Sequence, residues 1–310
     1  MNVVFFGTPA FAAKTLSYLL ENGVNIVAVV TQPDRPKGRS KKLAFSAVKD
    51  VALAHSLPLL QPEKSSAPES AEILASFQAD LFVVVAYGEI VKDNLLNMPK
   101  LGCINVHASL LPKYRGAAPI QRCLMNGEAE AGITIMHMAK KMDAGDVIEM
   151  TKVPITENTR FGELEAQLCD AGCKTLLKVI GDFEKGEVTG TPQNHELATF
   201  AKKMTTEECE ILWEKPAREL HNLIRGTSPR PGAWCMVNVK GKSKRMKVLG
   251  SQLSSSQGSK PAEIISYGKD GIVIACADGA IKLEELQLEG KKPATAAEFA
   301  LGIKQDEISF

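Results

Sequence analysis

The chain has 310 residues, which is long for one average domain and suits two. Hydrophobic residues make up 45% and charged residues 24%, as in an ordinary water-soluble globular protein, and no stretch approaches the length of a membrane span. The net charge is +1, so any attraction to a polyanion has to come from local clusters of basic side chains.

The seven cysteines form no CxxC pair, and no cluster of cysteine and histidine has the spacing of a metal site. The first residues, MNVVFFGTPAFAAKT, place no basic region ahead of their short apolar run. We therefore expect a cytoplasmic protein with reduced, mostly buried thiols, without a metal ion and without a membrane segment.

In the first half, short apolar runs alternate with helical patterns. The runs predict strands at 2–6, 26–30, 80–87 and 102–106, and the helical patterns predict helices ending near residue 21 and spanning about 46–55 and 159–184. Residues 132–138 and 146–153 alternate more strongly, as later or edge strands do. Continuous β-branched runs separated by helices are typical of a parallel sheet, which binds ligands at the carboxyl ends of its strands.

The pattern changes in the second half. A segment rich in Gly, Thr, Pro and Gln predicts a linker, which we place at 189–205, and one helix is expected within 206–226. Short strand-like runs follow, with turns near Gly241, Gly271 and Gly279 and a short helix near 294–302. This spacing predicts a small antiparallel β-barrel, so residues 1–188 and 206–310 are expected to be separate domains.

The stretch CINVHASLLPKYRGAAPIQ, residues 103–121, carries the candidate chemistry. Asn105 and His107 share one face at the carboxyl end of a predicted strand. An amide N–H that holds an oxyanion contributes about 3 to 4 kcal/mol, and a histidine that transfers a proton contributes roughly 10² to 10⁴ in rate. Asp143, in a Gly-containing loop between two predicted strands, is the expected third member. Without a GxSxG serine, direct attack of an amine on a carbonyl is the simplest reaction, although an isolated NxH pair is more often structural.

The whole string resembles the formyltransferase family that uses 10-formyltetrahydrofolate. The resemblance rests on NVH (105–107), SLLP (109–112), YRGAAPI (114–120) and MDxGD (142–146), and FFGTP, TQPDRPKGR and VVVAYGEI extend it to about residue 185. IRGTSPRPGAW (224–234) is similar to the carboxyl-terminal domain of members that formylate methionyl initiator tRNA. The resemblance implies a Rossmann-like catalytic domain followed by an OB-like tRNA-binding domain.

The resemblance also implies roles for particular residues. Asn105 holds the formyl oxygen, His107 assists as an imidazolium or a proton relay, and Asp143 stabilises His107 or positions a water. The expected folate-binding residues are Val85, Tyr87, Gly88 and Ile90 in the loop after the third strand, with Ser109, Leu110, Leu111 and Pro112, and the backbone of about 139–143. The SLLP run could instead be a rigid loop that places Asn105 and His107.

One position departs from the family pattern. Members usually carry glycine between the His and the Ser, where this chain has Ala108. If that position needs a positive φ, alanine costs about 1 kcal/mol there. His137, in step with Ile133 and Ile135, is expected to be a packed histidine and not a catalytic one.

Two basic clusters are the expected tRNA contacts. The first, after the second strand, contains Arg35, Lys37, Arg39, Lys41 and Lys42; the second contains Lys242, Lys244 and Arg245 and is expected between two barrel strands. The first cluster could be a solvated basic loop, but it follows the second strand and is therefore expected on the same sheet edge as the candidate site. Phosphate contacts would supply affinity, and the shape of the acceptor stem would supply selectivity.

Three other functions are less compatible with the sequence than formyl transfer to a methionyl initiator tRNA. A formyltransferase for an amino sugar or a glycinamide nucleotide needs neither the basic loop nor the second domain. A nucleotide-dependent oxidoreductase is disfavoured because FFGTPAF lacks the later glycines of the dinucleotide fingerprint. A silent RNA-binding protein would not need Asn105, His107 and Asp143 together. We expect a monomer with two partners, methionyl initiator tRNA and 10-formyltetrahydrofolate as formyl donor.

Overall fold

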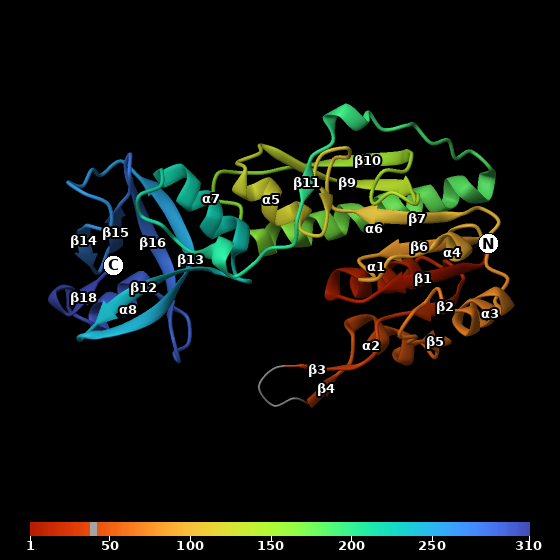
Figure 1. The fold of residues 1–310 in the computed structure, drawn as a ribbon, viewed down its shortest axis with the longest axis horizontal. Helices are drawn as coiled ribbons and strands as arrows, with labels where there is room; N and C mark the ends of the chain where they lie inside the picture. Colours follow the sequence, from red (N-terminus) through yellow and green to blue (C-terminus); the bar gives the residue numbers. More distant parts are fainter. Residues whose placement is uncertain (38–41) are drawn as a thin grey trace. The chain divides into compact units, whose positions relative to one another are not determined.

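The structure is a computed structural model that describes residues 1–37 and 42–310. It divides into two compact units, each assembled from three stretches of chain. The first unit contains residues 1–116, 130–153 and 165–200, and the second contains residues 117–129, 154–164 and 201–310 (Figure 1). No helix among the described residues is long and apolar enough to cross a membrane.

The first unit is built on a seven-stranded sheet with the order β10-β9-β7-β6-β1-β2-β5. The strands are β1 (Val3–Gly7), β2 (Ile26–Val30), β5 (Leu59–Leu60), β6 (Leu81–Val85), β7 (Cys103–His107), β9 (Glu130–His137) and β10 (Val147–Pro154). Five of them, from β7 to β5, run parallel, whereas β9 pairs antiparallel with β7. The predicted α/β class and the six predicted strands are therefore confirmed, while β5 is an addition.

Helices cover both faces of this sheet (Figure 1). On one face, α6 (Phe161–Lys185) packs with Gly172 close to Val106 and Ile133, and its Cys173 lies near Thr15 of α1 (Ala10–Glu21). On the other face, α3 (Pro68–Ser76) and α4 (Asp93–Leu96) contribute Leu74 and Leu95 to the apolar cluster around Phe6 and Phe82. α2 (Ala47–Ala54) contacts α1. All seven cysteines lie among the described residues and are buried, and none of them forms a disulfide.

A small antiparallel β-barrel forms most of the second unit. Its strands have the order β14-β15-β16-β13-β12-β18, with β17 beside β16. They are β12 (Ala233–Val239), β13 (Lys242–Ser254), β14 (Ile264–Gly268), β15 (Gly271–Ala275), β16 (Ala280–Leu288), β17 (Ala294–Thr295) and β18 (Ile308–Ser309). The predicted antiparallel barrel is therefore confirmed.

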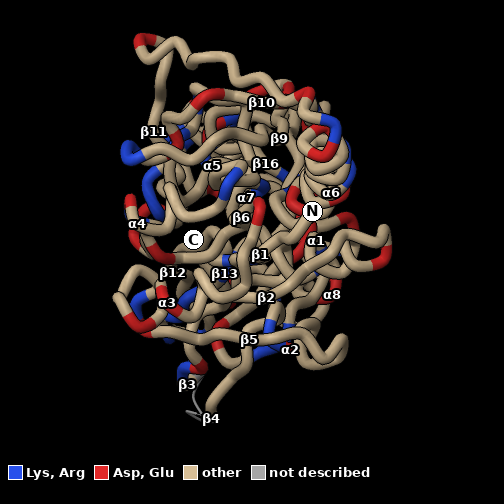
Figure 2. The backbone as a smooth tube through the Cα atoms, turned by 90° about the vertical axis from the view of Figure 1, so that its right-hand side faces the viewer, with Lys and Arg blue, Asp and Glu red and all other residues tan. Residues whose placement is uncertain are grey.

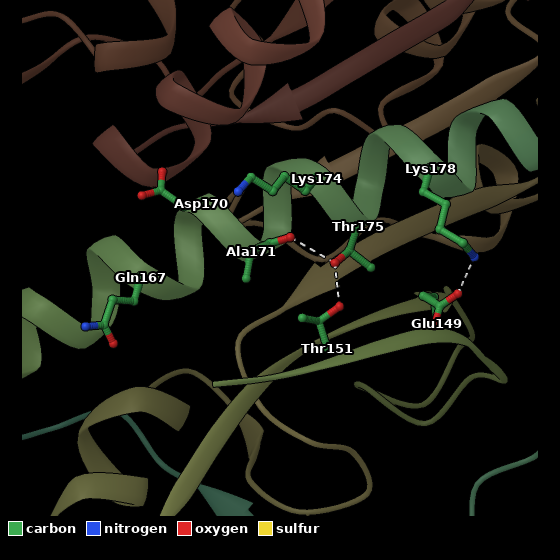
Figure 3. Close-up of a pocket in the computed structure, with 8 residues that line it drawn as sticks. All are labelled: Glu149, Thr151, Gln167, Asp170, Ala171, Lys174, Thr175 and Lys178. Atoms are coloured by element: carbon green, nitrogen blue, oxygen red, sulfur yellow. Dashed lines mark hydrogen bonds and ion pairs between the residues drawn. The ribbon is translucent and has the colours of Figure 1, made fainter. Parts of the chain in front are cut away.

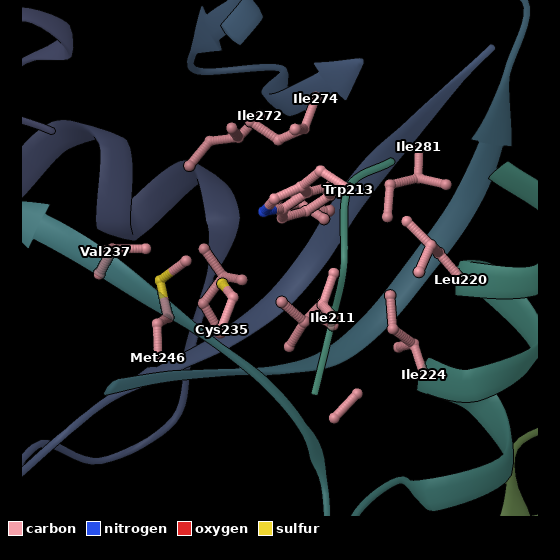
Figure 4. Packing of buried hydrophobic residues seen from close by; sticks show 14 of the residues in the cluster. Ile211, Trp213, Leu220, Ile224, Cys235, Val237, Met246, Ile272, Ile274 and Ile281 are labelled. Atoms are coloured by element: carbon pink, nitrogen blue, oxygen red, sulfur yellow. The ribbon is translucent and has the colours of Figure 1, made fainter. Parts of the chain in front are cut away.

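Three helices complete the second unit, α5 (Pro119–Met125), α7 (Ala217–Thr227) and α8 (Ala296–Gly302). Trp213 is buried in the barrel core among Ile211, Ile272 and Ile281 (Figure 4). Its ring meets the ring of Phe310 edge to face. α5 packs against α7, so a helix from the middle of the sequence is part of this carboxyl-terminal unit.

Candidate active site

Asn105 and His107 lie at the carboxyl end of β7, on the face of the strand that also carries Cys103. Because strand residues alternate between faces, the intervening Val106 points to the other side, against Gly172 of α6. Asn105 is partly exposed, and its side-chain amide has no hydrogen-bond partner among the residues that the structure describes. Its N–H groups are therefore available to a substrate oxygen.

The imidazole of His107 is buried between two groups. Its Nε2 lies 2.9 Å from the carbonyl oxygen of Tyr114, and its Nδ1 lies 3.7 Å from Oδ2 of Asp143. A carbonyl oxygen can only accept, so Nε2 carries a hydrogen. Nδ1 is then the ring nitrogen that faces the Asp143 carboxylate.

The segment Tyr114–Gly116 touches both members of this pair. The carbonyl of Tyr114 binds His107, and the backbone N–H of Gly116 donates to Oδ2 of Asp143 at 2.8 Å. Tyr114 and Asp143 adopt positive φ values of 61° and 49°, which are uncommon for residues other than glycine. Backbone strain of this kind is often found at functional sites, where the surrounding contacts maintain it.

The turn after β7 is held by a hydrogen bond of its own and by contacts with β9. The hydroxyl of Ser109 donates to the carbonyl of Lys113 at 2.6 Å, and the hydroxyl of Thr134 donates to the carbonyl of Ser109, also at 2.6 Å. Leu111 is buried and its N–H donates to Thr134, while Leu110 packs against Gly132. These contacts support the interpretation of the SLLP run, including Pro112, as a rigid loop. A folate contact from it stays a prediction.

Ala108 does not have a positive φ. The cost that we considered for alanine at this position therefore does not arise, because the turn begins from ordinary backbone.

The loop after β6 offers a surface with free backbone groups. Val85 and Tyr87 are buried, and positive φ values of 47° at Ala86 and 92° at Gly88 turn the chain sharply. Among the described residues, no backbone N–H from Tyr87 to Val91 donates a hydrogen bond. Ile90 is 69% exposed. A flat pterin ring needs an apolar surface and hydrogen-bond partners at its edge, and this loop has exposed apolar surface beside unpaired backbone N–H groups. These features are compatible with the prediction that folate binds at this loop.

Tyr87 stiffens this loop. Burial raises the pKa of Tyr87 to about 12, so its phenol keeps its proton and donates to Glu89 at 3.3 Å. The hydroxyl of Thr8 donates to the carbonyl of Tyr87 at 2.8 Å, which attaches the loop to the end of β1.

Gln193 was not among the predicted site residues. It is buried, and its Nε2 donates to the backbone carbonyls of Asp143 at 3.0 Å and Gly145 at 2.7 Å. Its Oε1 accepts from the guanidinium of the buried Arg115. Residues 189–200, where we expected the start of a linker, belong to the first unit. A lone Gln in a turn-rich segment carries no periodic signal, so the sequence could not indicate this role.

His137 packs as expected. Its ring meets Phe183 edge to face at 6.1 Å, and burial holds its pKa below the usual value while Asp146 opposes that shift. It does not take part in the contacts between His107 and Asp143.

The first basic cluster lies on a hairpin that the sequence did not predict. β3 (Arg35–Lys37) pairs antiparallel with β4 (Lys42–Ala44), with Lys37 opposite Lys42. Arg35 is exposed and forms an ion pair with Glu63 at 2.9 Å, and both signs of charge occur around β3 and α2 (Figure 2). Arg39 and Lys41 lie outside the described residues.

The sequence predicts the second basic cluster between two barrel strands. In the structure it lies instead on the first half of β13. Lys240 and Gly241, both with positive φ, form the two-residue turn from β12. Lys242 and Arg245 are exposed, Lys244 is partly exposed, and the Arg245 guanidinium stacks on the ring of Trp234 at 3.9 Å. Lys242 and Lys244 share one face of the strand because strand residues alternate between faces, and we call these two side chains the basic row.

A groove of about 580 Å³ lies between β10 and α6 (Figure 3). Lys178 and Glu149 form an ion pair across it, and the hydroxyls of Thr151 and Thr175 lie 2.7 Å apart. Asn105, His107 and Asp143 do not line it. The chemistry is expected at the carboxyl end of β7 and not in this groove.

The arrangement of Asn105, His107 and Asp143 suits attack on a carbonyl carbon. The comparisons with known proteins show the family to which the chain belongs. The family described as formyl transferase matches residues 1–180, and the formyl transferase carboxyl-terminal domain matches residues 203–304. The chain therefore belongs to the formyltransferase family.

Relatives named methionyl-tRNA formyltransferase match over nearly the full length. The protein of Protochlamydia amoebophila is 50% identical, with 100% of this chain and 98% of the relative covered. The protein of Chlamydia abortus is 45% identical, with 97% of this chain and 95% of the relative covered. The protein of Geobacter metallireducens is 41% identical, with 98% of this chain and 96% of the relative covered.

Solved structures show the same fold at low identity. The sugar 3N-formyl transferase WlaRD, solved in the presence of dTDP and 5-N-formyl-THF, has a TM-score of 0.69 and 19% identity, covering 94% of this chain and 99% of its own. HypX from Aquifex aeolicus in complex with tetrahydrofolic acid has a TM-score of 0.65 and 17% identity. There, 96% of this chain matches 46% of HypX.

Proposed function

We propose that this protein transfers the formyl group of 10-formyltetrahydrofolate to the α-amino group of methionyl initiator tRNA. The product is N-formylmethionyl-tRNA, which starts translation, and we place the enzyme in the cytoplasm as a monomer. Full-length identity of 50% to a methionyl-tRNA formyltransferase supports the substrate. The observation that carries the chemistry is the free amide of Asn105 beside the pair of His107 and Asp143.

In the proposed reaction, the methionyl amine attacks the formyl carbon, and the carbonyl oxygen becomes an oxyanion. Asn105 donates an N–H to that oxygen, and this contact strengthens as the negative charge develops. The bond from the formyl carbon to N10 of the folate then breaks. The amine loses one proton and N10 gains one, so the proton balance closes.

His107 has one nitrogen free for this proton transfer. Nε2 is committed to the carbonyl of Tyr114, so Nδ1 is the atom that carries a proton during the reaction. Asp143 lies beside Nδ1 and stabilises the imidazolium. The Gly116 N–H fixes the carboxylate in that position.

The substrates are held by separate parts of the chain. For the folate, we propose the loop of Val85, Tyr87, Gly88 and Ile90, with the backbone of residues 139–143 and the SLLP run. For the tRNA, we propose phosphate contacts from Arg35, Lys37, Arg39, Lys41 and Lys42, and from Lys242, Lys244 and Arg245 on β13.

The test is a formyl-transfer assay with 10-formyltetrahydrofolate and methionine-charged initiator tRNA, using methionine-charged elongator tRNA as the control. We expect formylation of the initiator alone. Formylation of neither tRNA by a protein that still binds tetrahydrofolate would overturn the proposed substrate. Equal formylation of both would remove the initiator selectivity.

A further inference from the structure

We infer that Gln193 is a positioning residue for the formyl transfer: its side-chain amide holds the loop of Asp143 so that the carboxylate faces His107. This inference rests on the proposed function. It comes from the contacts of one buried side chain with the loop on one side and with Arg115 on the other.

The loop that carries Asp143 has few contacts of its own. The backbone N–H of His137 donates to the carbonyl of Asp146 at 2.9 Å, which closes the base of the loop. Within it, the N–H of Ala144 donates to the carbonyl of Lys141 at a long 3.3 Å. Asp143 has a φ of 49°, a conformation that costs energy unless neighbouring contacts stabilise it. The loop therefore needs support from outside.

Gln193 supplies that support on both sides of Ala144. The two hydrogens of its Nε2 reach the carbonyls of Asp143 at 3.0 Å and Gly145 at 2.7 Å. One side chain thus fixes the peptide group that follows Asp143 and the peptide group that follows Gly145, which restrains the loop on the carboxyl side of Asp143.

The orientation of this amide is set by Arg115. Nη2 of Arg115 donates to Oε1 of Gln193 at 2.6 Å, and Nε donates to the same oxygen at 3.2 Å. An oxygen must therefore face Arg115 and a nitrogen must face the loop. A side-chain amide meets both demands, whereas a carboxylate would place an oxygen against two carbonyl oxygens.

These contacts form a closed ring. Arg115 lies between Tyr114, whose carbonyl binds His107, and Gly116, whose N–H binds Asp143. Gln193 joins the side chain of Arg115 to the backbone of Asp143. The segment that holds His107 and the loop that holds Asp143 are thereby fixed to each other, although a gap of 3.7 Å separates the imidazole from the carboxylate.

The segment that carries Gln193 is itself anchored beside the sheet. Thr191 and Val147 exchange backbone hydrogen bonds of 2.8 Å in both directions. This bridge ties Thr191, two residues before Gln193, to Val147 at the start of β10. The backbone that carries the Gln193 side chain is therefore fixed to the sheet.

The test compares Gln193→Met and Gln193→Glu with the wild-type protein. Met keeps the approximate length of the side chain without hydrogen bonds, and Glu keeps the acceptor for Arg115 but loses the donor to the loop. We expect kcat to fall about 10- to 100-fold in both variants, with KM for both substrates within about twofold, because a small misplacement of a reacting group costs rate more than binding.

A double variant separates positioning from general damage. If Gln193 acts through the carboxylate of Asp143, adding Gln193→Met to Asp143→Asn will lower kcat no further than Asp143→Asn alone. If the fall in kcat of the double variant equals the product of the falls in the two single variants, the inference is overturned, because Gln193 then acts independently of the Asp143 carboxylate. Asn194→Ala is the matched control: it removes the neighbouring side chain, which caps a short helical turn, without touching the loop of Asp143.

A second readout does not depend on activity. The amide hydrogen of Gly116 donates to Asp143, so its exchange rate in ¹⁵N-glycine-labelled protein reports where that carboxylate lies. We expect at least about tenfold faster exchange in Gln193→Met, with the exchange of glycines outside the Asp143 loop, such as Gly172 in α6, unchanged. Unchanged exchange at Gly116 would overturn the inference even in a folded, active protein. An inactive wild type would count against the proposed function alone, since this measurement would still stand.

Discussion

Nε2 of His107 lies 2.9 Å from the carbonyl oxygen of Tyr114, and this contact sets which nitrogen of the ring is free for chemistry. The neutral imidazole is expected to carry its hydrogen on Nε2, leaving a lone pair on Nδ1 beside Asp143. In ¹⁵N NMR spectra of the neutral ring, Nε2 should show the protonated shift, with assignment by loss of the signal in His107→Gln. A hydrogen on Nδ1 would contradict the proposed role of that nitrogen.

Asn105→Ala tests the oxyanion contact. We expect kcat to fall about 10² to 10³-fold, because a well-placed donor to an oxyanion contributes that much. Tetrahydrofolate affinity should stay close to that of the wild type, since tetrahydrofolate lacks the formyl oxygen that Asn105 is expected to hold. Steady-state kinetics and a folate titration provide the two numbers, and Asn25→Ala, at an exposed position on the same unit, is the control. Retention of most of the turnover would remove Asn105 from the mechanism.

Two glycines of the first unit should respond to alanine in opposite ways. A Cβ at Gly145 would lie 1.8 Å from the carbonyl oxygen of His137, so Gly145→Ala must displace the loop of Asp143 and lower kcat by about 10- to 100-fold. A Cβ at Gly181 in α6 would meet nothing within 4 Å. Gly181→Ala should keep full activity and raise the free energy of unfolding by roughly 0.5 to 1 kcal/mol. Thermal unfolding and kcat of both variants check the pair.

His221 makes the stability of the second unit depend on pH. Burial lowers the pKa of His221 below 6.5, helped by the charge of Arg225 and opposed by the hydrogen bond to the carbonyl of Glu157. The unfolded chain binds the proton more readily than the folded one, so the stabilisation is complete above about pH 6.5 and is lost as the pH falls. His221→Gln, which can keep both hydrogen bonds, should flatten the change of Tm between about pH 7.5 and about pH 5. An equal slope in both proteins would contradict this.

The basic row on β13 should make tRNA binding sensitive to salt. Lys242→Ala and Lys244→Ala are each expected to weaken binding of initiator tRNA and to reduce the slope of log K against log salt concentration by about 1. Lys260→Ala, an exposed lysine elsewhere in the same unit, is the control. Filter binding over a range of salt concentrations measures the slope, and an unchanged slope would mean that this row does not contact phosphate.

Much of the fold follows from local patterns in the sequence. The β-branched run at 26–30 forms β2 with the predicted bounds, and Asn105 and His107 lie on one face of β7 as the alternation of strand residues requires. Asp143 reaches His107 because its loop, with glycine at 145, packs directly against the backbone of His137. Spacing and residue type were sufficient for these three.

Other features depend on contacts between distant residues. The antiparallel direction of β9 against β7 is set by the chain path through 108–129, which has no periodic signal. The β3–β4 hairpin is short and rich in charge and proline, so its pattern resembles a loop. Gln193 acts through hydrogen bonds to residues about fifty positions earlier, and no local pattern encodes such a pairing.

The contact between α5 and α7 has a consequence for how the protein is made. A Cβ at Gly226 would lie 2.9 Å from the side chain of Met125, so the two helices approach closely at this glycine. α5 leaves the ribosome long before α7 is synthesised, and until then its apolar side has no cover. Any chain that stops early therefore displays α5 to chaperones and proteases, and a fragment that begins after the linker displays the matching side of α7. Completion of synthesis is what conceals both.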